Sequence, residues 1–133
     1  MTVESIDLII IFILHYIADF LCQSREIADK KGKDIKYLLL HGLDYTLVMT
    51  GILISIGLIS TIISYNIGYT WVQLLSFGVI NGLLHTITDF ISSKFTSKFY
   101  TKKSYHSFFN VIGLDQLIHT ITLIITYNLI CLC

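Results

Sequence analysis

The chain has 133 residues, of which 54% are hydrophobic and 14% charged, and its formal net charge is zero. Soluble domains carry roughly a quarter charged residues, so this chain is too apolar for that class. It is also too hydrophobic to be disordered, and it lacks the basic excess of a nucleic-acid-binding domain. What remains is an integral membrane protein, organised as a single domain over residues 1–133.

Four apolar segments account for most of the chain, at about residues 6–22, 37–64, 70–92 and 108–132. A helix needs ~20 mostly apolar residues to cross a bilayer, and the last three segments meet this length comfortably. The first segment is shorter and contains His15 and Asp19. A transmembrane barrel would alternate polar and apolar residues, which these segments do not do. The sequence therefore predicts an all-α integral membrane four-helix bundle with up-down-up-down topology.

The nine basic residues give the expected orientation, because they fall in only two stretches, after the first and after the third segment. They are Arg25, Lys30, Lys31, Lys33, Lys36, Lys94, Lys98, Lys102 and Lys103. The positive-inside rule places such loops in the cytoplasm, which leaves both termini outside the plasma (inner) membrane. The expected partners are the lipid bilayer and an anionic lipid or phosphorylated substrate at the basic loops, with no nucleic acid. The small-residue pair Gly78 and Gly82 would pack either within the bundle or between protomers of a homo-oligomer.

Each apolar segment contains a histidine and an aspartate that are three or four residues apart. The pairs are His15/Asp19, His41/Asp44, His85/Asp89 and Asp115/His119. Residues at this spacing share one face of a helix. Ionisable groups at membrane depth are costly and normally face the protein interior, so each pair is a candidate functional site.

In the expected topology all four pairs lie at a similar depth, toward the cytoplasmic side. Helix bundles build metal sites from such inward-facing side chains, and these donors suit Zn first, with Fe, Mn or Ni as alternatives. Four imidazoles and four carboxylates would form two four-ligand sites, or one site with supporting partners. Asp44, only three residues from His41, is the candidate catalytic base or a carboxylate that orients a ligand. A proton relay and a purely structural hydrogen-bonded cluster are the alternatives.

Five short runs resemble the small bacterial and phage membrane proteins grouped as DUF3307. They are His15-Tyr-Ile-Ala-Asp-Phe-Leu-Cys-Gln23, Lys31-Gly32, Leu39-Leu-His41, His85-Thr-Ile-Thr-Asp89 and Leu114-Asp-Gln-Leu-Ile-His119. The resemblance covers about residues 8–125 and implies a site, Asp44 not included, made of the following residues: His15, Asp19, His41, His85, Asp89, Asp115 and His119. The family is similar in outline to membrane-bound metal-dependent hydrolases of the YdjM type.

These observations lead to an expected function: metal-assisted hydrolysis of a phosphoester or lipid-linked substrate near the cytoplasmic face. The first alternative is a conductor of divalent cations or protons that uses the same residues as a relay. The second is a small membrane effector without enzymatic activity. A conductor needs polar residues through to the other face, and the outer halves of the segments offer mostly Ser, Thr, Asn and Tyr.

Overall fold

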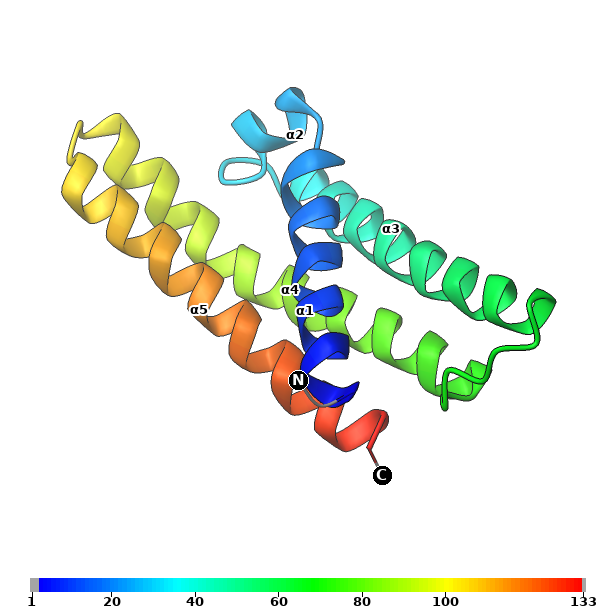
Figure 1. Ribbon diagram of the computed structural model, residues 1–133. Coiled ribbons are helices and arrows are strands. Elements are labelled where there is room, and N and C mark those ends of the chain that lie inside the picture. Colours follow the sequence, from blue (N-terminus) through cyan, green and yellow to red (C-terminus); the bar gives the residue numbers. More distant parts are fainter. Residues whose placement is uncertain (1–2, 133) are drawn as a thin grey trace.

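The computed structural model describes residues 3–132, with side chains from Ser5 onward, and this part of the chain is helical without strands. Its elements are α1 (Val3–Tyr16), the π-helix η1 (Ile17–Leu21), α2 (Arg25–Lys30), α3 (Ile35–Ile62), α4 (Trp71–Thr101) and α5 (Tyr105–Ile130). The central element is α4, which packs against α3 on one side and α5 on the other. Helix α1 crosses the front of this layer and contacts both α3 and α5 (Figure 1).

The expected all-α architecture is confirmed, but the four-helix bundle is found only in part. Helices α3, α4 and α5 have 28, 31 and 26 residues, and each is long and apolar enough to cross a membrane. Helix α1 has 14 residues before the chain changes to the π-helix η1, so it falls short of the usual length of a span. The short helix α2 lies in the first basic stretch, which the sequence analysis treated as a loop.

The second basic stretch is largely helical, which corrects the expectation of a loop. Helix α4 continues to Thr101, beyond the expected end near residue 92, so Lys94 and Lys98 lie on the helix. No glycine or proline occurs between Gly82 and Gly113, and a drop in hydrophobicity alone does not end a helix. The turn to α5 is therefore short, and Lys103 turns the chain with a φ of 56°.

Helices α3 and α4 approach closely because glycines of each face threonines of the other. A Cβ atom on Gly82 would lie 1.9 Å from Thr46 Oγ1, and one on Gly42 would lie 2.0 Å from Thr86 Oγ1. Gly78 faces Thr50 in the same way, at 2.3 Å from Oγ1. The pair Gly78 and Gly82 thus packs within the chain, and the close contact brings the Nε2 atoms of His41 on α3 and His85 on α4 to 3.0 Å from each other.

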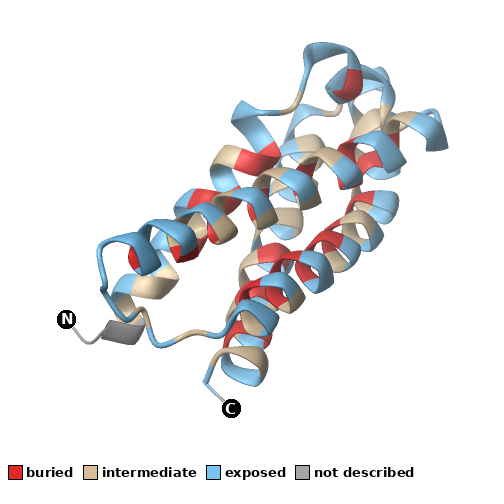
Figure 2. Cartoon of the chain, turned by 90° about the vertical axis from the view of Figure 1, so that its right-hand side faces the viewer, coloured by how far each residue is buried: buried red, intermediate tan, exposed pale blue. Residues whose placement is uncertain are grey.

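The interior contains buried polar residues beside an apolar core, and many large apolar residues lie on the outside of the molecule. The buried positions line the inner faces of the helices (Figure 2). They include all four histidines and two of the aspartates of the predicted pairs, whereas outward-facing residues such as Ile62 and Val72 are 80% and 72% exposed. This distribution is typical of helices that face lipid, because the outer surface has no need of polar groups.

Candidate metal centre

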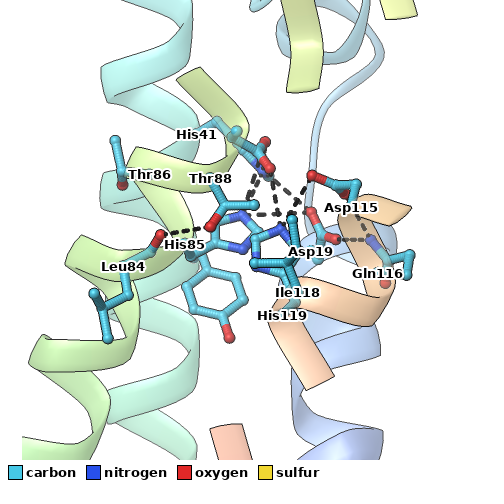
Figure 3. A network of polar contacts seen from close by, with 12 residues as sticks. Asp19, His41, Leu84, His85, Thr86, Thr88, Asp115, Gln116, Ile118 and His119 are labelled. Carbon is cyan, nitrogen blue, oxygen red and sulfur yellow. Dashed lines mark hydrogen bonds and ion pairs between the residues drawn. The ribbon is translucent and has the colours of Figure 1, made fainter. Parts of the chain in front are cut away.

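A buried group of four donor atoms lies between η1, α3 and α4. They come from Asp19, His41, His85 and Asp89, each of which offers one ligand atom within 4.8 Å of the others. The side chains of Asp19, His41 and His85 point toward one another between the helices (Figure 3). Their residues are at most 4% exposed, so this group, which we call the first donor group, is shielded from its surroundings.

The spacing within the first donor group suits a tetrahedral ion. His41 Nε2 lies 3.0 Å from His85 Nε2, 3.1 Å from Asp19 Oδ1 and 3.2 Å from Asp89 Oδ2. His85 Nε2 lies 3.5 and 3.9 Å from the same two carboxylate oxygens. Ligands at about 2.0–2.1 Å from a tetrahedral Zn²⁺ are about 3.3–3.4 Å apart, so these residues fit a metal.

A second donor group shares Asp89 with the first. His119 Nε2 lies 3.3 Å from Asp89 Oδ1 and 3.4 Å from Asp115 Oδ1, and these three atoms also lie within 4.8 Å of one another. Asp115 Oδ1 is buried and has no hydrogen-bond partner among the described residues. Both carboxylates and the imidazole therefore direct ligand atoms toward one another.

Two glutamines hold the donors in place. Gln116 Nε2 donates hydrogen bonds to Asp19 Oδ2 at 3.2 Å and to Asp115 Oδ2 at 3.1 Å, which leaves the Oδ1 atom of each carboxylate for the donor groups. The Gln23 amide lies 3.1 Å from His41 Nδ1 and fixes the ring from its other side.

Tyr45 is a further residue that supports the centre. It is 1% exposed, and its ring stacks on His85 with centroids 3.9 Å apart and planes 5° from parallel. Its hydroxyl lies 2.9 Å from His15 Nδ1. An aromatic residue at the membrane interface would be exposed. Tyr45 is instead buried against His15 and His85 and packs at the edge of the centre.

Lys31 is the residue at the centre that sequence reasoning missed. Its Nζ donates to Asp89 Oδ2 at 2.6 Å, although it belongs to the basic stretch interpreted as an orientation signal. The adjacent Gly32 explains how the turn after α2 comes so close, since a Cβ there would lie 2.5 Å from the carbonyl oxygen of Ser93. In the sequence, the adjacent pair Lys31-Gly32 was the feature that could have indicated this contact, because the glycine allows the close approach that the lysine needs.

The structure brings six of the eight predicted site residues into the two donor groups and leaves two outside. His15 Nε2 lies 3.8 Å from Asp19 Oδ2 and 3.4 Å from Gln116 Oε1, beside the centre but in neither group. Asp44 is half-buried on α3, and no ion pair or hydrogen bond of its side chain is found among residues 5–132. Three residues turn an α-helix through about 300°, so Asp44 lies about 60° around the helix axis from His41, and its side chain belongs to neither donor group.

A polar cavity of about 170 Å³ opens beside the two groups. Its lining includes Asp19, Asp89 and Asp115 together with Lys31, Gln23 and Gln116, and hydroxyl residues of α4 complete the wall: Ser92, Ser93 and Thr96. The Ser93 hydroxyl is buried and has no hydrogen-bond partner among the described residues. The cavity gives a small polar molecule access to the centre.

Charge at the centre is unbalanced when the imidazoles are neutral. Asp19, Asp89 and Asp115 contribute three negative charges, and Lys31 contributes one positive charge, so two negative charges remain. Buried charges need a partner or a metal, because removing them from water is costly. One divalent cation would restore neutrality.

Comparison with known proteins places this arrangement in a family. The sequence profile described as "Protein of unknown function (DUF3307)" matches residues 8–133, which includes every residue of the two donor groups. No curated protein and no solved structure matches the chain significantly. The chain belongs to the DUF3307 family.

Proposed function

We propose that this protein is a membrane-embedded metal-binding protein, and that the bound metal catalyses hydrolysis of a phosphoester or lipid-linked substrate. The observation that carries the proposal is the first donor group: four buried nitrogen and oxygen atoms from three separate elements, at spacings of 3.0–3.9 Å where measured. In a purely structural hydrogen-bonded cluster, two imidazole nitrogens have no need to approach each other. Here the Nε2 atoms of His41 and His85 lie 3.0 Å apart, and each also has carboxylate oxygens beside it.

The donor set favours Zn²⁺, with Fe, Mn or Ni as alternatives that accept the same ligands. An imidazole that binds a metal through Nε2 carries its proton on Nδ1 and donates it to an oxygen. The Gln23 amide lies beside His41 Nδ1. The nitrogen and oxygen of an amide group are nearly isosteric, so a rotation of the group by 180° places Oε1 where it can accept the proton of Nδ1. Gln23 is thus suited to orient His41 toward a metal.

The chemistry follows from the bound metal and the cavity. A divalent ion in such a site acts as a Lewis acid and lowers the pKa of a bound water toward ~7. The chain's own residues bind the substrate: Lys31 lines the cavity and suits an oxyanion such as a phosphoryl group. Ser92 and Ser93 also line the cavity, and the buried Ser93 hydroxyl has no hydrogen-bond partner among the described residues.

The proposed setting is the cytoplasmic side of the plasma membrane. The centre lies at the same end of the molecule as the basic residues. On α4, Lys94 follows Asp89 by between one and two helical turns, and Lys98 follows it by between two and three. The positive-inside rule then places the termini outside and the cavity close to the cytoplasmic headgroups. A lipid-linked substrate could reach the cavity from there with its polar end.

Conduction is the weaker alternative because an apolar layer lies between the centre and the other end of the bundle. Met49, Phe77 and Leu123 are 0–2% exposed and belong to one packed core. Beyond them, Asp7 accepts hydrogen bonds from the hydroxyls of Tyr69 and Tyr127. A proton or metal path would have to cross this layer, which supports a closed site over a channel.

The experiment is metal analysis of detergent-purified protein, coupled to hydrolysis of a chromogenic phosphodiester. We expect bound transition metal and metal-dependent turnover in the wild type, and loss of both in His85→Ala. Asp44→Ala is the control for metal content, because its side chain belongs to neither donor group. Wild-type protein without bound metal after loading would contradict the metal site; full loading without turnover on phosphoesters would contradict the hydrolase.

A further inference from the structure

We propose that the centre is dinuclear, with Asp89 as a bridging ligand between two metal ions and an anionic phosphoryl group as the ligand of the second ion. This inference rests on the proposed metal centre and extends it to the second donor group. The first ion would be held by Asp19, His41 and His85, and the second by Asp115 and His119, with one oxygen of Asp89 on each.

The two oxygens of Asp89 face different partners. Oδ2 lies 3.2 Å from His41 Nε2 and 3.9 Å from His85 Nε2, whereas Oδ1 lies 3.3 Å from His119 Nε2. Oδ2 also accepts a hydrogen bond from Lys31 Nζ at 2.6 Å. His119 Nε2 lies in hydrogen-bond contact with Oδ1, and with its proton on Nδ1 the same nitrogen would bind a second ion beside that oxygen.

Gln116 orients one carboxylate of each donor group. An amide nitrogen has two hydrogens, and Gln116 Nε2 uses them on Asp19 Oδ2 and Asp115 Oδ2. Each aspartate therefore directs Oδ1 inward, to the first group from Asp19 and to the second from Asp115. The lack of a hydrogen-bond partner for the buried Asp115 Oδ1 is independent support, because buried polar atoms are normally satisfied.

The second group has room for a substrate where the first does not. It offers three protein ligands instead of four, and two of these, Asp89 and Asp115, line the polar cavity. Three protein ligands with an open position are typical of catalytic sites. Two divalent ions would also reverse the charge of the centre, because four positive charges exceed the two negative charges left by the residues. The excess calls for an anion, and Lys31 and the Ser93 hydroxyl favour phosphate in the cavity.

The test is metal stoichiometry with Mn²⁺ as the probe, measured on detergent-purified full-length protein after loading and desalting. We expect two ions per chain in the wild type, one in His119→Ala and none in Asp89→Ala. Ions in two-metal sites lie about 3.5–4 Å apart, so electron paramagnetic resonance should show a coupled Mn²⁺ pair in the wild type and an isolated ion in His119→Ala. Inorganic phosphate should bind to the wild type with two ions and lose at least tenfold in affinity in His119→Ala.

The outcomes separate the two proposals. One ion per chain in the wild type, unchanged in His119→Ala, would overturn the dinuclear centre and leave the first site intact. No ion in the wild type would overturn both. The wild-type stoichiometry and spectrum require no variant, so they decide the question even where His119→Ala fails to fold. Phosphate binding of equal strength in the wild type and His119→Ala would overturn the assignment of the anion to the second ion.

Discussion

The Nε2 atoms of His41 and His85 lie 3.0 Å apart, on adjacent helices, each with carboxylate oxygens beside it. A hydrogen bond between two neutral imidazoles requires one of them to donate, yet each nitrogen also has acceptors from Asp19 and Asp89 around it. A cation placed among the four atoms satisfies all of them. This relationship depends on how closely α3 and α4 approach.

The first prediction concerns that approach. Gly82→Ala should destabilise the protein by about 1–3 kcal/mol, because its Cβ would lie 1.9 Å from Thr46 Oγ1 at the seam between α3 and α4. Gly51→Ala is the matched control, since a Cβ there meets nothing within 4 Å, and it should be neutral or stabilising. Thermal unfolding in detergent measures both. Adding Thr46→Gly should partly restore the stability lost in Gly82→Ala. Equal melting temperatures for the two alanine variants would contradict a close contact between α3 and α4 at Gly82.

Lys31→Met is expected to act in opposite directions on metal and anion. The ammonium group competes with a metal for Asp89 Oδ2, at 2.6 Å, so its removal should raise metal affinity by about tenfold, or about 1.4 kcal/mol. Phosphate binding should weaken, because the cavity loses its lysine. Lys33→Met is the control, as an exposed lysine two residues away. Calorimetric titration with Zn²⁺ and with phosphate measures both effects; a fall in metal affinity in Lys31→Met would show that the lysine supports the metal.

Asp44 offers a direct test of the base predicted from the sequence. Asp44→Ala should retain the metal content and the melting temperature of the wild type, because the side chain lies in neither donor group and does not line the cavity. Its turnover of a phosphodiester then decides the assignment. Loss of turnover with full metal content would support Asp44 as the base, and unchanged turnover would exclude it.

Orientation in the membrane can be tested by thiol labelling in intact cells. In a background with serine at Cys22, Cys131 and Cys133, a cysteine at Tyr65 should react with a membrane-impermeant maleimide added outside. Cysteines at Lys33 or Lys103 should react only after permeabilisation, because the basic residues are predicted to face the cytoplasm. Ready labelling of these two positions from outside would reverse the proposed topology.

The convergence of the donors could be predicted from sequence because it depends on helix geometry. His85 and Asp89, and Asp115 and His119, are four residues apart within uninterrupted helices, so each pair shares a face. His15 and Asp19 have the same spacing, but the chain changes to a π-helix at Ile17. The wider π turn alters the angle between them, which a purely α-helical interpretation could not anticipate.

Other features depend on contacts between distant parts of the chain. The contact of Lys31 with Asp89 joins residues 58 positions apart and requires the close approach of Gly32 to α4. The role of Gln116 likewise depends on Asp19, 97 positions away. Periodicity reports which face of a helix is buried, but it does not reveal which loop side chain reaches that face. The length of α4 was underestimated because hydropathy marks where a helix leaves the membrane and not where it ends.

Metal removal should lower the stability of the folded protein. A ligand at 100 times its dissociation constant stabilises the folded state by about 2.7 kcal/mol, so a chelator should reduce the melting temperature of the loaded wild type. Acidification should have the same effect, since histidines must be deprotonated to bind metal. Scanning fluorimetry in detergent measures this shift, and Asp89→Asn serves as the variant without a metal-dependent component. A wild-type melting temperature unaffected by both treatments would contradict a metal that supports the fold.

The most direct measurement is X-ray absorption spectroscopy at the zinc edge on Zn²⁺-loaded, detergent-purified protein. The two donor groups predict only nitrogen and oxygen ligands at about 2.0–2.1 Å, with the outer-shell scattering of imidazole, and loss of that imidazole signal in a variant lacking His41, His85 and His119. Sulfur ligands at about 2.3 Å, or a spectrum of hydrated zinc without imidazole, would contradict a metal centre built from these histidines and aspartates.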